Sequence, residues 1–200
     1  MTQNKIKIVG LTGGSGSGKS TVSKIFEKKG ACIIDGDKIS RQITEKNSPV
    51  LEKLKNAFGD EIINSDGTLN RRGLGSIVFS DKKSLELLNS ITHPAIYDET
   101  VKIIDGKKSE FNVFIIDAAA IFDCKPLLDL CEKIIVVCAD KHVRINRICL
   151  RDGILEKDAE NRINSQTAQD ILAKKADFVI YNNDSAQNLE KSADEVWNCL

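Results

Sequence analysis

The chain has 200 residues, a length typical of one domain with a small insertion. Hydrophobic residues make up 41% of it and charged residues 29%, which excludes a disordered, collagen-like or low-complexity chain. Lysine plus arginine and aspartate plus glutamate each number 29, so the net charge is zero and no overall field attracts nucleic acid. Any anion-binding site must therefore be local.

The location of the protein is inferred from its apolar runs and its cysteines. The longest apolar runs, such as 134–139, are too short to span a bilayer, and residues 1–7 lack the apolar core of a signal peptide. The six cysteines form no C-x-x-C pair and are expected to be free thiols in a reducing compartment. With two histidines, His93 and His142, no zinc site is expected. We expect a cytoplasmic protein, a monomer or weak oligomer, that binds no membrane and no nucleic acid.

Five continuous apolar runs predict the strands of a parallel sheet that is covered on both faces. In chain order they are 6–11, 31–34, 112–116, 134–138 and 178–181. Amphipathic patterns predict a helix over residues 19–28 and another that follows Pro49. The alternation of strands and helices predicts the α/β class.

The spacing of these runs is uneven. About 75 residues separate the second run from the third, far more than one crossover helix needs. We expect a single domain over 1–200, with a nucleotide-binding core (about 1–37, 107–139 and 175–200), a helical acceptor-binding insertion (about 38–106) and a lid (about 140–174).

Residues 13–20, GGSGSGKS, match the phosphate-loop pattern G-x-x-x-x-G-K-[ST], and a predicted strand precedes them while a predicted helix follows. The glycines let backbone N–H groups surround an anion, to which the helix N-terminus adds positive potential. Lys19 can reach the β- and γ-phosphates, and the Ser20 hydroxyl can coordinate Mg²⁺. No N-K-x-D guanine motif is present. The expected ATP contacts from the loop are Gly14, Ser15, Gly16, Ser17, Gly18, Lys19, Ser20 and Thr21.

Carboxylates follow two of the predicted strands. Ligands of open parallel sheets bind beyond the carboxyl ends of the strands, so Asp35, Asp37 and Asp117 should border the phosphate loop. If strand geometry persists, Asp35 and Asp37 point the same way, and one of them could accept the proton of an acceptor hydroxyl. Asp117 takes the position of a Walker-B acid that holds Mg²⁺ directly or through water. The alternatives are a polar turn at 35–37 and a helix cap at Asp117.

Arg144, Arg147 and Arg151 fall on one face of a predicted helix that Asp140 would cap and 152–153 would end. Such arginines could close over ATP and stabilise charge on the transferred phosphoryl group. The alternative is a solvated face paired with nearby acids, and for Arg144 the two interpretations are evenly balanced.

The motifs together resemble the dephospho-coenzyme A kinases, over nearly the whole chain and in the same order. The matching elements are 10–22 (GLTGGSGSGKSTV), 35–41 (DGDKISR), 66–72 (DGTLNRR), 88–89 with 93–94 (LN, HP), Arg147 with 151–152, Gln166, and 176–182. The resemblance implies a P-loop kinase core, a helical CoA-binding region and a lid. It also implies ATP-dependent phosphorylation of the ribose 3′-hydroxyl of dephospho-CoA, the last step of coenzyme A synthesis.

The resemblance also implies a role for each matched position. Asp37 would be the base near the 3′-hydroxyl, and with Lys19 and Arg147 it forms the expected catalytic set. Lys19 would serve the phosphates, Ser20 the magnesium ion, and Arg147 and Arg151 would contact ATP from the lid. The expected acceptor-side residues are Arg71, Asn89 and His93, to which we add Asp117. His93 alone would otherwise indicate a capping or core histidine.

One segment departs from the family pattern D-x-P-L-L-[FI]-E. This chain reads DAAAIFD over 117–123, so the proline, a leucine and the final glutamate are replaced. Ala120 is smaller than leucine, which predicts a looser or repacked wall of the acceptor pocket. Ser15 stands where the family usually has an apolar residue, with little expected consequence.

Two other functions remain open on the sequence. A P-loop kinase could phosphorylate another small hydroxyl acceptor, such as a nucleoside, nucleotide or sugar. A nucleotide-gated switch could present the helical insertion to a partner, although such a switch has no need for acids at the strand ends.

Overall fold

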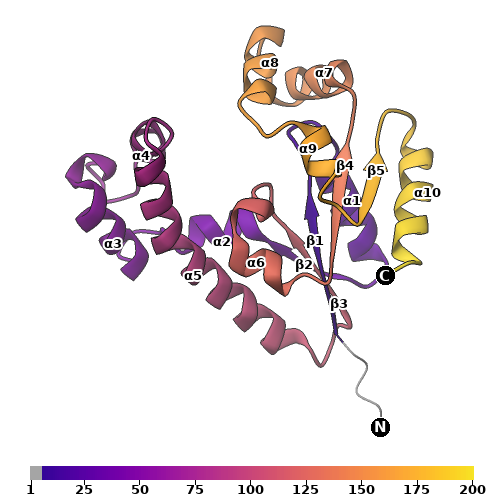
Figure 1. Ribbon diagram of the computed structural model, residues 1–200, viewed down its shortest axis with the longest axis horizontal. Helices are drawn as coiled ribbons and strands as arrows, with labels where there is room; N and C mark the ends of the chain where they lie inside the picture. Colours follow the sequence, from indigo (N-terminus) through magenta and orange to yellow (C-terminus); the bar gives the residue numbers. More distant parts are fainter. Residues whose placement is uncertain (1–5) are drawn as a thin grey trace.

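The computed structural model describes residues 6–200, and its centre is a five-stranded, all-parallel sheet (Figure 1). The strands are β1 (Lys7–Thr12), β2 (Cys32–Asp35), β3 (Val113–Asp117), β4 (Lys133–Cys138) and β5 (Phe178–Tyr181), in the spatial order β2-β3-β1-β4-β5. The register sets Leu11 and Asp35 beside Asp117, so the carboxyl ends of β1, β2 and β3 lie level with one another. The predicted α/β fold class is confirmed.

Helices cover both faces of the sheet because each strand is apolar on both sides. On one face, α1 (Lys19–Lys28) and α10 (Ala186–Trp197) pack on residues such as Val9 and Ile135. On the other, a short 3₁₀ turn η2 (Ile121–Asp123), α6 (Lys125–Leu130) and α9 (Gln169–Ala173) pack on Ile116 and Val136. This explains the continuous apolar runs in the sequence.

Four helices between β2 and β3 form what we call the helical arm (residues 36–107). They are α2 (Gly36–Gln42), α3 (Pro49–Phe58), α4 (Arg71–Val78) and α5 (Lys82–Lys107), with a 3₁₀ turn η1 (Asp60–Ile62) after α3. The outer part has its own core, in which Leu54 and Ile62 are fully buried. The helix expected after Pro49 is α3, and Pro49 is its first residue. Ser48 caps it, since the Ser48 hydroxyl accepts a hydrogen bond from the Leu51 N–H.

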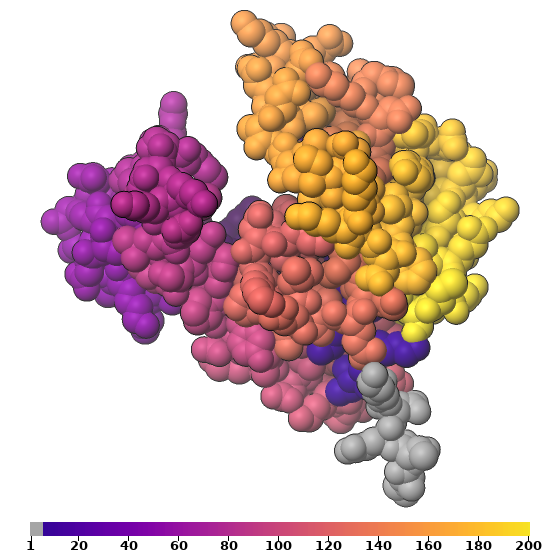
Figure 2. All heavy atoms as spheres, viewed as in Figure 1, coloured from indigo at the N-terminus to yellow at the C-terminus, as the bar shows by residue number. Residues whose placement is uncertain are grey.

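Between β4 and β5 lie α7 (Lys141–Asp152), α8 (Glu156–Asn164) and α9. Ile148, Ala159 and Ile163 form a small core between α7 and α8. Figure 2 shows an open notch between these orange helices and the magenta helical arm. The notch lies above the carboxyl ends of β1, β2 and β3.

The five predicted strands and the helix over 19–28 appear in the structure, with strand ends shifted by at most one residue. One local expectation is wrong. Strand geometry does not persist past Asp35, because α2 begins at Gly36, so Asp35 and Asp37 do not share a strand face. Within residues 6–200, no helix has the length and apolar character needed to cross a membrane.

Candidate active site

The phosphate loop connects β1 to α1 and borders a cavity of about 380 Å³. Gly18, with φ of 97°, is in the left-handed region and starts α1 directly against the side chain of Asn182. A Cβ at this position would overlap the Asn182 amide, so glycine is required both for backbone conformation and for space. The residues that line the cavity are Gly13, Gly14, Ser15, Gly16, Gly18, Lys19, Ser20, Thr21, Asp37, Ala119, Arg147, Arg151 and Gln166.

Arg144, in α7, hydrogen-bonds to the backbone of the phosphate loop. Its side chain donates a hydrogen bond of 2.8 Å to the Ser15 carbonyl and one of 3.1 Å to Gln166, whose side chain also accepts from the Ser15 N–H. Arg144 is 4% exposed, and burial lowers the pKa of its guanidinium. It is therefore neither a solvated arginine nor one that lines the phosphate cavity; it positions the loop backbone.

Arg147 and Arg151 lie further along α7 and both line the phosphate cavity. The Arg147 guanidinium donates to the backbone carbonyl of Asn182 at 3.0 Å and to its side-chain oxygen at 3.2 Å. Arg151 is exposed and pairs with the carboxylate of Asp152, which also raises the pKa of the arginine. Gly153 ends α7 in the left-handed conformation, as expected, while Asp140 occupies the N-cap position without a side-chain cap bond.

Lys19 and Asp117 meet at the carboxyl end of the central strands. The Lys19 ammonium pairs with one carboxylate oxygen of Asp117, and the Ser23 hydroxyl of α1 donates to the other. The Asp117 side chain is 12% exposed. It is thus held by two partners at the floor of the site, and it lines neither the phosphate cavity nor the cavity described next.

Asp35 and Asp37 differ in what they do. Asp35 caps α2, since its carboxylate accepts a 2.8 Å hydrogen bond from the Lys38 N–H. Asp37, in the first turn of α2, lines the phosphate cavity and also a second cavity of about 410 Å³. Asp37 is therefore the acid that lies on the boundary between the two spaces.

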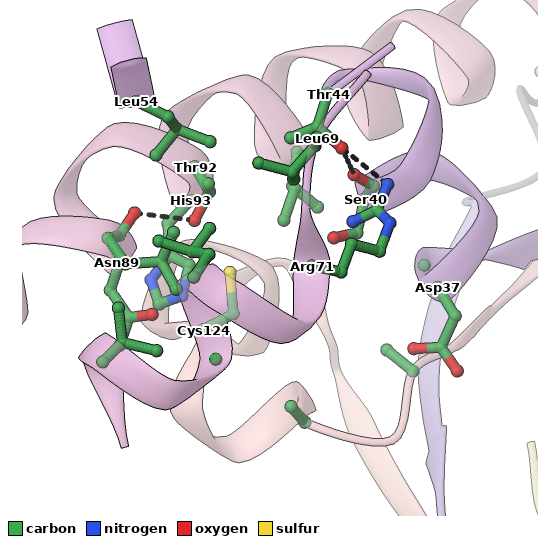
Figure 3. Close-up of a pocket in the computed structure, with 18 of the residues that line it drawn as sticks. Asp37, Ser40, Thr44, Leu54, Leu69, Arg71, Asn89, Thr92, His93 and Cys124 are labelled. Atoms are coloured by element: carbon green, nitrogen blue, oxygen red, sulfur yellow. Dashed lines mark hydrogen bonds between the residues drawn. The ribbon is translucent and has the colours of Figure 1, made fainter. Parts of the chain in front are cut away.

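The second cavity lies between the helices of the arm and the segment 118–127 that follows β3, and Figure 3 shows its lining. Apolar side chains dominate, among them Leu54, Leu69 and Leu74, and few polar groups point inward. The polar lining side chains are those of Asp37, Ser40, Thr44, Arg71, Asn89, Thr92 and His93. A largely apolar wall with a few placed polar groups is typical of a pocket for a flat, partly polar molecule such as a nucleoside.

Two of these polar groups are affected by burial. Burial lowers the pKa of His93, an effect that the carboxylate of Asp123 partly opposes. Burial lowers the pKa of Arg71 too, and the positive charge of Arg41 lowers it further. Arg71 donates a 2.8 Å hydrogen bond to the Thr44 hydroxyl (Figure 3).

The structure thus brings most of the expected site residues onto two adjoining cavities. From the expected ATP set, Ser17 does not line the phosphate cavity, because its hydroxyl is buried. That hydroxyl has no hydrogen-bond partner among the described residues. From the expected acceptor set, Arg71, Asn89 and His93 line the second cavity and Asp117 does not. Ala120 and Ala118, from the segment that departs from the family pattern, lie in its wall. All of these functional assignments stay predictions.

Sequence reasoning gave no role to Asn182 or Ser23, although both contact the phosphate site. Asn182 donates to the Ser17 carbonyl at 2.8 Å. Ser23 lies one helical turn after Lys19, so the two side chains share one face of α1. That face is turned toward Asp117 at the end of β3. For Asn182, its place directly after the predicted last strand was the available signal.

The parallel sheet carries a phosphate loop after its first strand, and an acid lies on the boundary between the phosphate cavity and a mainly apolar cavity. Arginines reach the phosphate cavity from a nearby helix. This combination defines a P-loop kinase of small molecules. A family model described as dephospho-CoA kinase matches residues 7–188. The dephospho-CoA kinase of Corynebacterium efficiens is 40% identical over 193 residues, covering 94% of both chains. That of Fusobacterium nucleatum is 42% identical, covering 94% of this chain and 96% of the other. The chain belongs to the dephospho-CoA kinase family.

Solved structures agree with the fold. The crystal structure of TT1252 from Thermus thermophilus matches with a TM-score of 0.80 at 26% identity, over 98% of both chains. Dephospho-CoA kinase from Campylobacter jejuni matches with a TM-score of 0.66 at 28% identity, over 96% of this chain and 95% of the other. A shikimate kinase from Acinetobacter baumannii, at 14% identity and a TM-score of 0.53, shares the fold alone.

Proposed function

We propose that this protein transfers the γ-phosphoryl group of ATP to the ribose 3′-hydroxyl of dephospho-CoA, which gives coenzyme A and ADP. One observation carries the residue roles: Asp37 lines both the phosphate cavity and the mainly apolar cavity. A hydroxyl bound beside Asp37 would face the γ-phosphate held by the loop. Family membership supplies the identity of the acceptor.

In this reaction the oxygen of the 3′-hydroxyl bonds to the γ-phosphorus while the bond to the β–γ bridging oxygen breaks. Asp37 accepts the proton of the hydroxyl, and ADP leaves with the bridging oxygen. Lys19 and the loop N–H groups stabilise negative charge on the phosphates. Arg147 and Arg151 line the same cavity from α7 and contribute further positive charge as the phosphoryl group moves.

The hydroxyl oxygen of Ser20 and the carboxylate of Asp117 are ligands of the kind that Mg²⁺ prefers. This ion is usually held by one or two protein oxygen groups together with substrate phosphates. No cluster of three or more histidine, cysteine or acidic side chains suited to a metal occurs within residues 6–200. We assign to the ion Ser20, which lines the phosphate cavity, and Asp117, which lies at the floor of the site beside Lys19 and Ser23 and would act directly or through water. When bound, Mg²⁺ neutralises part of the phosphate charge.

The test is ADP release from MgATP with dephospho-CoA, with the mass of the product measured. Adenosine, CMP and gluconate serve as control acceptors. A product heavier by one phosphoryl group, formed from dephospho-CoA alone, would support the proposal. Transfer to another acceptor and not to dephospho-CoA would support the alternative, a kinase redirected by the altered 117–123 segment. Absence of transfer to every acceptor would contradict both.

We also propose that the chain works in the cytoplasm as a monomer or weak oligomer, with ATP and dephospho-CoA as its partners and no nucleic acid. The balance of 29 basic and 29 acidic residues supports the absence of nucleic-acid binding, because the protein has no net charge to attract a polyanion. Light scattering after size-exclusion chromatography, at several protein concentrations, would test the oligomeric state. A mass that stays at two or more chains on dilution would contradict it.

A further inference from the structure

A third cavity of about 250 Å³ opens beside the mainly apolar cavity, and its lining is basic. It is formed by the end of α2, the loop that follows, and the start of α4. Its lining residues are Arg41, Thr44, Glu45, Lys46, Thr68, Leu69 and Arg71. Three of them, Thr44, Leu69 and Arg71, also line the mainly apolar cavity, so the two spaces adjoin. Figure 3 shows these three residues in the lining of the mainly apolar cavity.

We propose that this basic cavity binds the diphosphate of the acceptor, the group that joins the nucleoside to the rest of dephospho-CoA. The inference rests on the proposed function and extends it to Arg41 and Lys46. It assigns a second anion-binding site, separate from the phosphate loop, because the basic cavity and the phosphate cavity have no lining residue in common.

The order of the three cavities matches the order of groups in the acceptor. Asp37 joins the phosphate cavity to the mainly apolar cavity, and Arg71 joins the mainly apolar cavity to the basic one. In the acceptor, the 3′-hydroxyl and the 5′-diphosphate lie on opposite sides of one ribose. With the hydroxyl at Asp37 and the base in the apolar space, the diphosphate extends toward Arg71.

Within residues 6–200 the basic side chains form no ion pair, although the positive charge of Lys46 acts on the nearby Asp66 carboxylate and helps to lower its pKa. In the described part of the chain, no carboxylate oxygen lies within 4.0 Å of the charged nitrogens of Arg41, Lys46 or Arg71. Glu45 lines the same cavity but forms no ion pair with them there. By contrast, Lys55 on the same arm pairs with Asp60. Neighbouring cations that lack ion-pair partners favour a bound anion.

Two of the three cations are also held in place. Arg71 is fixed by its hydrogen bond to Thr44 and by a longer one, 3.4 Å, to the Arg41 carbonyl. Lys46 donates a 2.6 Å hydrogen bond to the Asp66 carbonyl, and its aliphatic part lies against Gly67. The carboxylate of Asp66 is occupied by the N–H and hydroxyl of Thr68. These contacts orient positive groups at the cavity before any ligand enters, which reduces the entropic cost of binding.

The test compares two variants with a matched control. Arg41→Gln and Lys46→Gln each remove one charge from the basic cavity. Lys53→Gln removes the same charge from an exposed position on α3 that lines none of the three cavities. Steady-state rates give KM for dephospho-CoA and for ATP, and adenosine is added as a competitive inhibitor that lacks the diphosphate.

We expect KM for dephospho-CoA to rise about tenfold in Arg41→Gln and in Lys46→Gln, because each loses a charge-assisted contact to phosphate. KM for ATP and the inhibition constant of adenosine should stay at their wild-type values, and Lys53→Gln should match wild type throughout. The rise should shrink at high salt, where screening weakens the same interaction in wild type.

Two results would overturn the inference while leaving the proposed function intact. One is an unchanged KM for dephospho-CoA in both variants. The other is an equal loss of adenosine and dephospho-CoA affinity, which would show that the variants disturb the apolar cavity instead. Wild-type protein that does not phosphorylate dephospho-CoA would overturn the proposed function, and with it this subsite.

Discussion

The side-chain amide of Asn182, directly after β5, donates a 2.8 Å hydrogen bond to the carbonyl oxygen of Ser17 in the phosphate loop. The same side chain accepts from Arg147, so one buried residue connects the loop, the last strand and α7. Asn182 therefore couples the position of Arg147, which lines the phosphate cavity, to the shape of the loop.

Replacing Asn182 with alanine should lower both stability and nucleotide affinity. The Ser17 carbonyl would lose its partner in a buried environment, which costs about 1–3 kcal/mol of the free energy of unfolding. KM for ATP should rise, since the loop and Arg147 lose a shared anchor, while KM for the acceptor stays the same. Urea denaturation and steady-state kinetics measure the two effects.

Asn183→Ala provides the control for that substitution. Asn183 is exposed, and its side chain bonds to the Asp140 N–H and carboxylate, away from the phosphate loop. We expect a loss below about 1 kcal/mol and an unchanged KM for ATP. Equal effects of the two substitutions would contradict the role given to Asn182.

Asp37 and Asp35 allow a matched test of the base. Asp37→Asn keeps the size of the side chain and removes its ability to accept a proton, so the turnover number should fall about 10²- to 10⁴-fold while ATP still binds. Asp35→Asn removes the same charge two residues away, where asparagine caps a helix as well as aspartate does. Turnover of the Asp35 variant should stay near wild type.

The readout for this pair is the rate of ADP release at saturating substrate, with ATP binding measured separately by calorimetry. If Asp37→Asn kept its turnover, the proton acceptor would have to be another group. If Asp35→Asn lost as much turnover as Asp37→Asn, the effect would come from the charge of α2 and not from one base.

The sequence predicted the sheet and the phosphate loop because both depend on local patterns. Buried parallel strands are apolar on both faces, and the loop needs glycines and a lysine at fixed spacing. It also placed Asp37 near the phosphates. The residue pattern alone did not separate Asp37 from Asp35, and only the family resemblance pointed to Asp37, since the distinction depends on the point at which β2 ends and α2 begins.

Long-range contacts account for what was left open. Arg144 was evenly balanced between binding and solvation, and its burial under the loop follows from the packing of α7 against residues about 130 positions earlier. The basic cavity combines the end of α2 with the start of α4, and no spacing rule connects Arg41 to Arg71. Both features require the folded chain.

Two glycines outside the site offer a test of the backbone geometry. Gly106 is an exposed residue of α5 with open space around its Cβ position, so Gly106→Ala should raise the free energy of unfolding by about 0.5–1 kcal/mol. Gly30 also has open space, but its φ is 96°. Gly30→Ala should lower stability by about 1–2 kcal/mol, because a side chain disfavours the left-handed region. Urea denaturation of both variants measures the difference, and the same sign for both would contradict the backbone assigned to Gly30.

The stability of the protein should depend on pH through His93. Burial lowers the pKa of His93, so its folded value lies below the usual value of about 6.5. The unfolded chain then binds more protons than the folded chain in this range. The contribution of neutral, buried His93 to the free energy of unfolding is therefore fully present above about pH 6.5 and is lost as the pH falls toward the folded pKa. The difference in free energy of unfolding between wild type and His93→Gln should therefore decrease as the pH falls through this window.

Asp123 provides a second variant for this measurement. Its carboxylate partly opposes the effect of burial on the pKa of His93. Asp123→Asn should lower that pKa further, so the loss of stability should extend to lower pH than in wild type. Urea denaturation at several values between about pH 5 and 7.5 follows both curves. Wild-type protein that gains stability relative to His93→Gln as the pH falls would show that the folded state stabilises the protonated histidine, contrary to its burial in the mainly apolar cavity.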